Sequence, residues 1–492
     1  MTEAHDRRRG VFGDIALGEA AAVVVGLGAF FSTLLAYSGA TIAFVPVGNT
    51  GTFMETFAES LLAAAAVMSG VVAVAAFFGR RLPFRALSLG GGALYLATAA
   101  VFVFFVWAGL EGAAPVVALA IAVAAADVCL ALAWGRICAR FKIREALVVV
   151  ALASVVSAGI LLACALLPLA GLMATFLAAS VVAVAVPAAL SRTVHENEPG
   201  PRDMRERAGQ VGGLLSSLLS VIAAPGLGLV VFAFVMAVMR GEFLASQVTY
   251  LAMLALSGAV LAAYGLAGRH LVSLHEGFYH TFLPLLALVL LAVTSVEATL
   301  GLGSTPASCL TYALYSFALV ITLATLCAVA NAGEFPADLV FSAALFLFTA
   351  TSSIGQNIAG LLENDYVDVV VAVATAFYAF VMVLSTYFEH RRDRLWTREE
   401  AAPDQPAAPD VPAASATPAA PERIDPCERL AAEHHLTPRE TEILSYLAQG
   451  HNGSYISNAL FISPNTARTH IHNIYRKLGV SSREEILQLT KG

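Results

Sequence analysis

Residues 463–483 read SPNTARTHIHNIYRKLGVSSR, and this stretch predicts one amphipathic helix with a defined beginning and end. Ser463 is a typical N-cap, and Pro464 suits the first helical position because its missing N–H would have no partner there. Gly479 suits the helix end, where a left-handed residue is common. Apolar residues recur between them at helical spacing, which predicts one buried face. They are Ile471, Ile474, Tyr475 and Leu478.

Three further helices are expected around this one. Thr437 and Glu440 form a capping box on either side of Pro438, and Gly450 closes the helix that they start. Shorter apolar patterns predict helices over about 454–460 and 482–490. A short helix, a tight turn and a longer basic helix make a helix-turn-helix. The sequence therefore predicts a four-helix DNA-binding domain over residues 431–492.

The polar face of the 464–478 helix is the expected contact with double-stranded DNA, because a recognition helix lies in the major groove. Side chains able to hydrogen-bond base edges are Asn465, Arg468, Thr469 and His472. Side chains expected to contact phosphates are Thr466, Arg476 and Lys477. The alternative is a solvated face on a small adaptor domain that docks onto another protein.

This domain resembles the DNA-binding domain of the LuxR-type regulators. The signature residues here are Leu436, Thr437, Arg439, Glu440, Gly450, Ile456, Leu460, Ile462, Ser463, Thr466, Arg468, His470, Asn473, Ile474, Lys477, Leu478, Gly479 and Arg483. The resemblance implies that Arg468, Thr469 and His472 face the bases and that the fourth helix supports a homodimer on DNA. Departures from the family pattern are Gly453, Tyr455, Ser457 and Ala467, which we expect to loosen the second helix.

The preceding residues have a different composition. Residues 391–430 are rich in Ala and Pro without hydrophobic periodicity, which predicts a cytoplasmic linker that does not fold alone. Over the whole chain only 13% of residues are charged, against about 25% in soluble domains. Residues 1–390 hold about twelve apolar runs long enough to span a bilayer. These runs are 15–37, 56–78, 86–108, 113–134, 146–168, 171–190, 213–239, 244–267, 278–299, 309–332, 338–361 and 366–388.

Basic residues support this count. Of the 28 Lys and Arg, all except Arg240 fall in the N-terminus, in every second loop or in the C-terminal tail. Lys and Arg remain on the cytoplasmic side of bacterial membrane segments. The expected protein is all-α: a polytopic bundle in the bacterial inner membrane, with both termini cytoplasmic, followed by the four-helix domain.

The bundle resembles the major facilitator superfamily, with two groups of six spans and a charged central loop. Gly79, Arg80 and Arg81 match the end of that family's motif between spans 2 and 3, but its Asp-Arg pair is missing. The family layout implies a substrate cavity between the two halves. The missing acidic residue argues against active transport.

Ionisable and polar residues inside apolar spans are candidate ligand contacts, because burial of such groups in lipid is costly. The candidates are Asp127, Glu19, Gln356 and Asn357. Alternatives stay open for each: Glu19 at headgroup level, Asp127 in a helix–helix hydrogen bond, and Gln356 and Asn357 as contacts between helices.

Together these features predict a membrane-bound one-component transcription regulator whose bundle senses a small molecule. The whole chain resembles a group of bacterial LuxR-type regulators with a twelve-span N-terminal domain, and that resemblance implies a response to small molecules. The alternative is a major-facilitator-like transporter with an appended regulatory domain. No phosphate loop, metal-ligand spacing or nucleophile pattern indicates an enzyme, a metal site or a cofactor.

Overall fold

The computed structural model describes residues 16–37, 50–109, 112–191, 226–241, 246–267, 305–333, 335–361, 369–381 and 426–491, apart from 461, 463, 481 and 482, together with a few single residues near 285–293, 367 and 383–384. Every regular element in these ranges is a helix. The helices up to residue 381 belong to one compact unit, and those from Pro426 onward belong to a second. We call them the membrane unit and the C-terminal unit.

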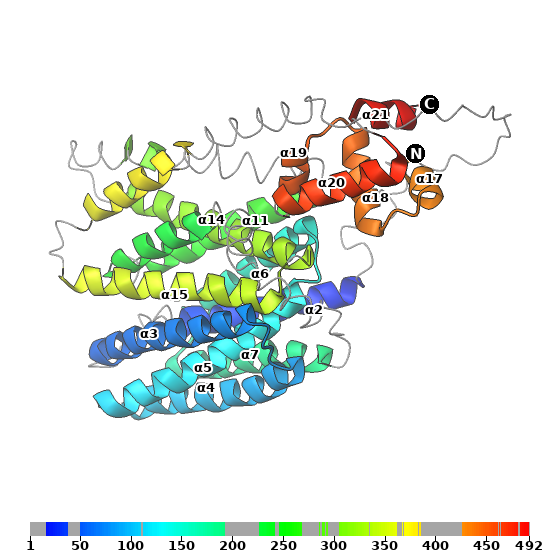
Figure 1. The fold of residues 1–492 in the computed structure, drawn as a ribbon. Coiled ribbons are helices and arrows are strands. Elements are labelled where there is room, and N and C mark those ends of the chain that lie inside the picture. The colour runs from blue at the N-terminus through cyan, green and yellow to red at the C-terminus, as the bar shows by residue number, and fades with distance from the viewer. Residues whose placement is uncertain are drawn as a thin grey trace, which may run out of the picture. The chain divides into compact units, whose positions relative to one another are not determined.

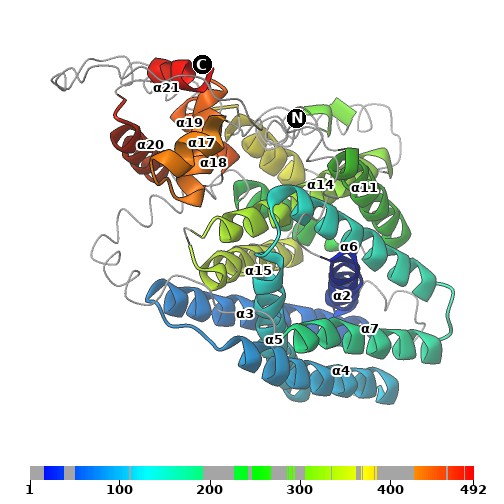
Figure 2. The same cartoon turned by 90° about the vertical axis from the view of Figure 1, so that its right-hand side faces the viewer.

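The membrane unit is a bundle of long apolar helices (Figures 1 and 2). Its first half contains α2 (Leu17–Leu35), α3 (Thr50–Phe77), the π-helical turn η3 (Ala86–Gly90), α4 (Gly91–Ala108), α5 (Ala113–Cys138), α6 (Ile143–Cys164) and α7 (Leu169–Leu190). Its second half contains α11 (Gln247–Ala267), α14 (Thr305–Asn331) and α15 (Ala337–Leu361). In lipid, a helix is favoured because it satisfies its own backbone hydrogen bonds.

Nine helices in the described residues are long and apolar enough to cross a membrane, and each falls on a predicted span. The multi-pass membrane prediction is therefore confirmed. Shorter apolar helices at Gly226–Val238 and Val369–Val381 lie within two more of the predicted spans. The predicted span 278–299 lies almost wholly outside the described residues.

The surface of the bundle is apolar. Val67 is 67% exposed and Trp107 is 70% exposed, positions that would be unfavourable in water but suit contact with lipid. Trp107 lies at the end of α4, where an amphipathic ring suits the headgroup level. These side chains support a lipid partner for this unit.

The helix α6 packs against α2 and against α11. In each contact a glycine of the neighbouring helix lies against α6. A Cβ on Gly28 would lie 2.8 Å from the carbonyl oxygen of Ala153, and one on Gly258 would lie 2.7 Å from that of Ala151. Both glycines thus allow one helix to approach the backbone of α6 closely. Such contacts drive helix association in lipid, where burial from water is not available.

The two halves are also joined by polar contacts at one end. Arg136 of α5 donates two hydrogen bonds to Asp338 of α15, at 2.7 and 2.5 Å; Asp338 is buried and Arg136 is largely buried. Arg144 of α6 donates to the carbonyl of Gly265 in α11 at 2.9 Å. α3 also runs alongside α15 in both views (Figures 1 and 2). The basic residues lie at the end predicted to be cytoplasmic.

The C-terminal unit contains α17 (Pro426–Glu433), α18 (Pro438–Ala448), α19 (Gly453–Ala459), α20 (Pro464–Leu478) and α21 (Arg483–Lys491). The last four are the helices expected from the sequence. α17 was not expected: its first residues fall in the segment 391–430 that was predicted as linker. Leu430 and Ala431 of α17 are buried, so the folded unit begins earlier than the composition indicated.

The predicted helix ends of α18 and α20 are confirmed where they are described. In α18, Glu440 Oε2 accepts the Thr437 backbone N–H at 2.8 Å, and Thr437 Oγ1 accepts the Glu440 N–H at 3.3 Å. Gly450 and Gly479 have φ values of +87° and +68°. The proposed cap Ser463 lies outside the described residues.

A packing test follows from the glycine contacts of α6. We expect Gly28→Val and Gly258→Val to destabilise the membrane unit by about 1–3 kcal/mol or more, since the added carbons meet backbone atoms. Gly159→Val is the control, because Gly159 lies in α6 itself and a Cβ there has no atom within 4 Å. The measurement is the thermal unfolding midpoint of the full chain in detergent. Equal midpoints for all three variants would show that close approach is not required.

Candidate functional site

The first candidate site is the outward face of α20. Arg468, Thr469, His472 and Arg476 are exposed, and the four-residue spacing of 468, 472 and 476 places them in one stripe. The opposite face is buried; its residues are Ala467, Ile471, Ile474 and Leu478. Thr466 is half-buried at the start of the helix, and the side chain of Asn465 lies outside the described residues. Burial of this face thus fixes which side chains α20 presents outward.

The short helix α19 packs on α20 and completes the helix-turn-helix. Asn452 Oδ1 accepts the backbone N–H of Tyr455 at 2.8 Å, which caps the start of α19. The rings of His451 and Tyr455 stack with centroids 3.8 Å apart and planes 11° apart. Burial lowers the pKa of His451, which favours a neutral ring in this stack. These contacts hold α19 in place, so the expected loosening by Gly453 and Tyr455 is not evident.

Ser457 and Ala467, the other two departures from the family pattern, are both buried. Ser457 is 2% exposed in α19, and Ala467 is 0% exposed in α20. Small side chains at these two positions suit the contact between the two helices. The unusual residues therefore belong to the packing of the helix-turn-helix and not to its outer face.

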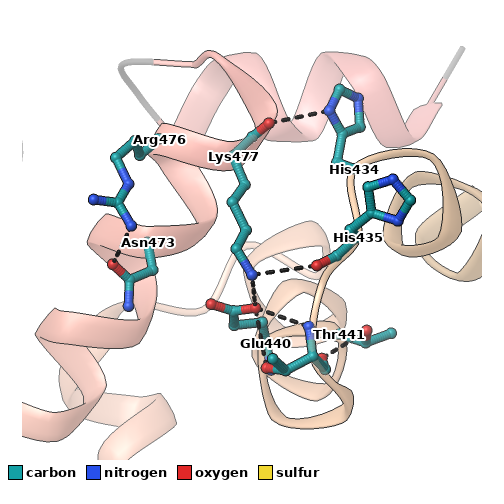
Figure 3. Close-up of polar contacts among 8 residues, drawn as sticks. His434, His435, Glu440, Thr441, Asn473, Arg476 and Lys477 are labelled. Carbon is teal, nitrogen blue, oxygen red and sulfur yellow. Dashed lines mark hydrogen bonds and ion pairs between the residues drawn. The ribbon is translucent and has the colours of Figure 1, made fainter.

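Lys477 has partners inside the domain (Figure 3). Its Nζ lies 2.6 Å from Glu440 Oε2 and donates to the carbonyl of His435 at 3.2 Å. The carbonyl of Lys477 lies 3.0 Å from His434 Nδ1. Lys477 therefore ties the end of α20 to the start of α18 and to the turn after α17. Lys477 therefore has a structural role, and the phosphate contact expected for it stays a prediction.

The charge of Glu440 depends on that arrangement. Burial raises the pKa of Glu440, but hydrogen bonds from Lys477 and Thr437, together with attraction by Lys477, outweigh burial and lower the pKa overall. A lowered pKa in the folded state means that the carboxylate contributes stability above the ordinary Glu value of 4.5. That contribution is lost as pH falls through the folded-state pKa.

We therefore expect Glu440→Gln to destabilise a fragment of residues 426–492 at pH 7 by about 1–3 kcal/mol, the range for a buried hydrogen bond to a charged group. The difference from wild type should shrink as pH falls below about 4. Urea denaturation followed by circular dichroism measures both. The control is Glu442→Gln, since Glu442 is exposed and pairs with Arg439 at 2.7 Å on the surface. An equal loss in both variants would contradict the role of the buried pair.

The second candidate site is a cavity of about 410 Å³ inside the membrane unit. Residues from both halves line it, most of them apolar. Asp127 lies near the middle of α5 and is 8% exposed, and Gln356 of α15 is 9% exposed; both line the cavity. The structure thus brings together two of the four predicted ligand contacts.

The other two predicted contacts lie elsewhere. Glu19 pairs with Arg140 at 2.6 Å near the end of the bundle, and neither lines the cavity. Asn357 is exposed, and its Nδ2 donates to the carbonyl of Ser353 at 2.8 Å. Residues that line the cavity but were not predicted include Ser157, Tyr250 and Tyr315. Each has other polar residues near it in the same apolar segment, and no sequence signal distinguishes it from them.

Within the described residues, no group of three or more His, Cys, Asp or Glu side chains is placed to hold a metal ion. The cavity is instead bounded by aromatic and aliphatic side chains with a few polar groups. That composition is typical of sites for organic molecules.

Comparison with known proteins identifies the C-terminal unit. Residues 434–490 match the family described as bacterial regulatory proteins, luxR family. The HTH-type transcriptional regulator MalT of Yersinia pestis (strain Pestoides F) is 42% identical over 53 residues, which are 11% of this chain and 6% of that protein. The probable csgAB operon transcriptional regulatory protein of Salmonella typhimurium is 44% identical over 50 residues, 10% of this chain and 23% of that protein. The C-terminal unit is a LuxR-type helix-turn-helix domain.

These matches cover only a small part of each relative, so what they share with this chain is the domain. Solved structures similar to the rest include the human organic anion transporter MFSD10 (TETRAN), with 16% identity, 74% of this chain and 97% of that chain covered, and a TM-score of 0.49. The major facilitator superfamily transporter FucP, in the outward conformation, has 12% identity, 74% and 96% coverage, and a TM-score of 0.43. Similarity at this level carries no conclusion about function.

Proposed function

We propose that this protein is a membrane-bound transcription regulator of the bacterial inner membrane. In this proposal α20 binds promoter DNA, and the membrane unit binds a small molecule that controls this binding. The observation that carries it is the outward stripe of Arg468, Thr469, His472 and Arg476 on α20, in a LuxR-type domain joined to a multi-pass membrane unit. No chemical reaction is assigned to the chain.

Arg468, Thr469 and His472 are the proposed base-reading residues, with Asn465 beside them at the start of the helix. Arg can make a bidentate contact with guanine, and Asn with adenine. Arg476, one turn further along, and Thr466 are the proposed phosphate contacts. This division follows from the N-terminal half of a recognition helix lying against the base edges.

Both chain ends are proposed to be cytoplasmic, because the Lys and Arg outside the helices lie in alternate loops and at the two ends. DNA is then accessible to the C-terminal unit. Residues from both halves of the bundle line the membrane cavity, so a molecule bound there contacts elements on each side. It changes DNA binding only if it binds one arrangement of the bundle better than another.

The direct test compares transcripts in cells with the wild-type gene, with Arg468→Ala and with a deletion. We expect Arg468→Ala and the deletion to change the same small set of genes. Arg429→Ala is the control, since Arg429 is an exposed arginine on α17, outside α19 and α20. Unchanged transcription in Arg468→Ala together with altered uptake in the deletion would instead favour a transporter.

Binding measurements on the purified protein distinguish base contacts from phosphate contacts. At a promoter fragment enriched by chromatin immunoprecipitation, we expect Arg468→Ala to weaken specific binding by about 1–3 kcal/mol. Arg476→Ala should weaken specific and non-specific DNA alike and reduce the salt slope by about 1. Fluorescence anisotropy across a salt series measures both. Identical salt slopes for wild type and Arg476→Ala would remove Arg476 from the phosphate contacts.

A homodimer on DNA is also proposed, with α21 as its contact. Leu489 of α21 is 42% exposed, whereas Ile486 on the same helix is fully buried in the domain. We expect Leu489→Asp to weaken binding to a two-half-site fragment at least about tenfold through lost avidity, without lowering the unfolding midpoint. Binding to a single half-site is the control and should stay unchanged. An equal loss at single and paired half-sites would contradict the dimer.

A further inference from the structure

One buried acid, Asp127, lines the cavity. Asp127 is more than nine-tenths buried, and its Oδ1 has no hydrogen bond to any described residue. The Ser157 hydroxyl, which also lines the cavity, is buried without a hydrogen-bond partner as well. Buried polar groups are nearly always satisfied in folded proteins, so two unsatisfied groups on one cavity indicate a missing partner.

Aromatic rings form part of the cavity wall, which is otherwise mostly aliphatic. Tyr250 and Tyr315 pack with ring centroids 6.4 Å apart, and both line the cavity. Trp134, two helical turns from Asp127 on α5, is fixed by a hydrogen bond from its Nε1 to the carbonyl of Ala183 at 3.1 Å. A Cβ on Gly26 would lie 2.7 Å from the Trp134 ring, so the ring packs directly against this glycine. Aromatic faces attract organic cations.

Few charged side chains line the cavity. Arg240 is the one basic residue among those lining the cavity, and Asp127 is the one acidic residue. Arg240 interacts electrostatically with Glu55 and Glu59, so its charge is already opposed by two carboxylates. The buried Asp127 carboxylate is not hydrogen-bonded to Arg240. A buried carboxylate is costly without a cation or hydrogen-bond donors beside it.

We propose that this cavity binds an apolar organic amine whose protonated nitrogen pairs with Asp127. The inference rests on the proposed function, for which it names the class of ligand. The ammonium donates to Asp127, and the aromatic and aliphatic walls enclose the rest of the molecule. A carboxylate of the same shape is disfavoured by repulsion from Asp127. A neutral molecule leaves the acid without a charged partner.

The site spans both halves of the bundle. Asp127 lies on α5 of the first half, whereas Tyr315 and Gln356 lie on α14 and α15 of the second. An amine held by Asp127 and enclosed by these residues contacts both halves at once. Its binding therefore depends on their relative arrangement, which is the property that a regulatory ligand requires.

The test uses the full chain in lipid nanodiscs and three probes with the same aryl-alkyl body: 4-phenylbutylamine, 4-phenylbutanol and 4-phenylbutyrate. We expect the amine to raise the thermal unfolding midpoint and to bind by titration calorimetry, and the alcohol and the acid to do neither. We expect Asp127→Asn to weaken amine binding by about tenfold or more, because a charge-assisted hydrogen bond is lost.

Glu19→Gln is the matched control, since Glu19 is a membrane-unit acid outside the cavity; it should retain full amine binding. The proposal is overturned if the alcohol or the acid binds as tightly as the amine to the wild-type chain. Amine binding that is equal in wild type and Asp127→Asn overturns it too. The wild-type probe comparison stands even if Asp127→Asn does not fold.

The binding assay is independent of transcription. Asp127-dependent amine binding with transcripts that do not depend on Arg468 would support the ligand class and reject the proposed function. Arg468-dependent transcription without any amine preference would support the regulator and reject the ligand class.

Discussion

Close approach of helix backbones is the constraint on which the membrane unit depends. Lipid is as apolar as the side chains that face it, so burial from water cannot hold the helices together. Gly28 and Gly258 instead bring α2 and α11 within van der Waals reach of carbonyl oxygens on α6. This arrangement positions α6, and with it Ser157, at the cavity wall.

The C-terminal unit is held together by different forces, because its exposed side chains are mostly polar and its apolar ones are buried. Burial of Ile443, Leu444 and Ile474 supplies an apolar core. The Lys477–Glu440 pair joins α20 to α18 at its edge. The core and this pair together set the rotation of α20 about its axis. Arg468 and His472 therefore face outward in the domain by itself, before any DNA is bound.

The proposed function requires that ligand binding in the membrane unit changes DNA binding by the C-terminal unit. In the membrane unit, the halves meet through the buried Arg136–Asp338 pair at one end and through the cavity that contains Asp127. Breaking a buried ion pair by separating its partners is costly, so such a contact tends to be either made or broken as a whole. In the proposed function, a ligand that binds one arrangement of the halves more tightly shifts the bundle toward that arrangement. The response is a change in DNA binding by α20.

Local rules in the sequence determined the ends and the type of most helices. The capping box of Thr437 and Glu440, the glycine stops at 450 and 479, and the long apolar runs each depend on neighbours a few residues away. They also predicted which face of α20 is outward, since helical periodicity alone separates Ile471 and Ile474 from Arg468 and His472.

Only the tertiary structure decided the contacts between distant residues. Lys477 was indistinguishable from a phosphate contact until Glu440, 37 positions away, was placed beside it. Asp127 and Gln356 were two polar residues among several until packing brought them to one cavity and left Glu19 and Asn357 outside it. Spacing along the chain sets which face a residue lies on, but the packing of other helices sets what that face meets.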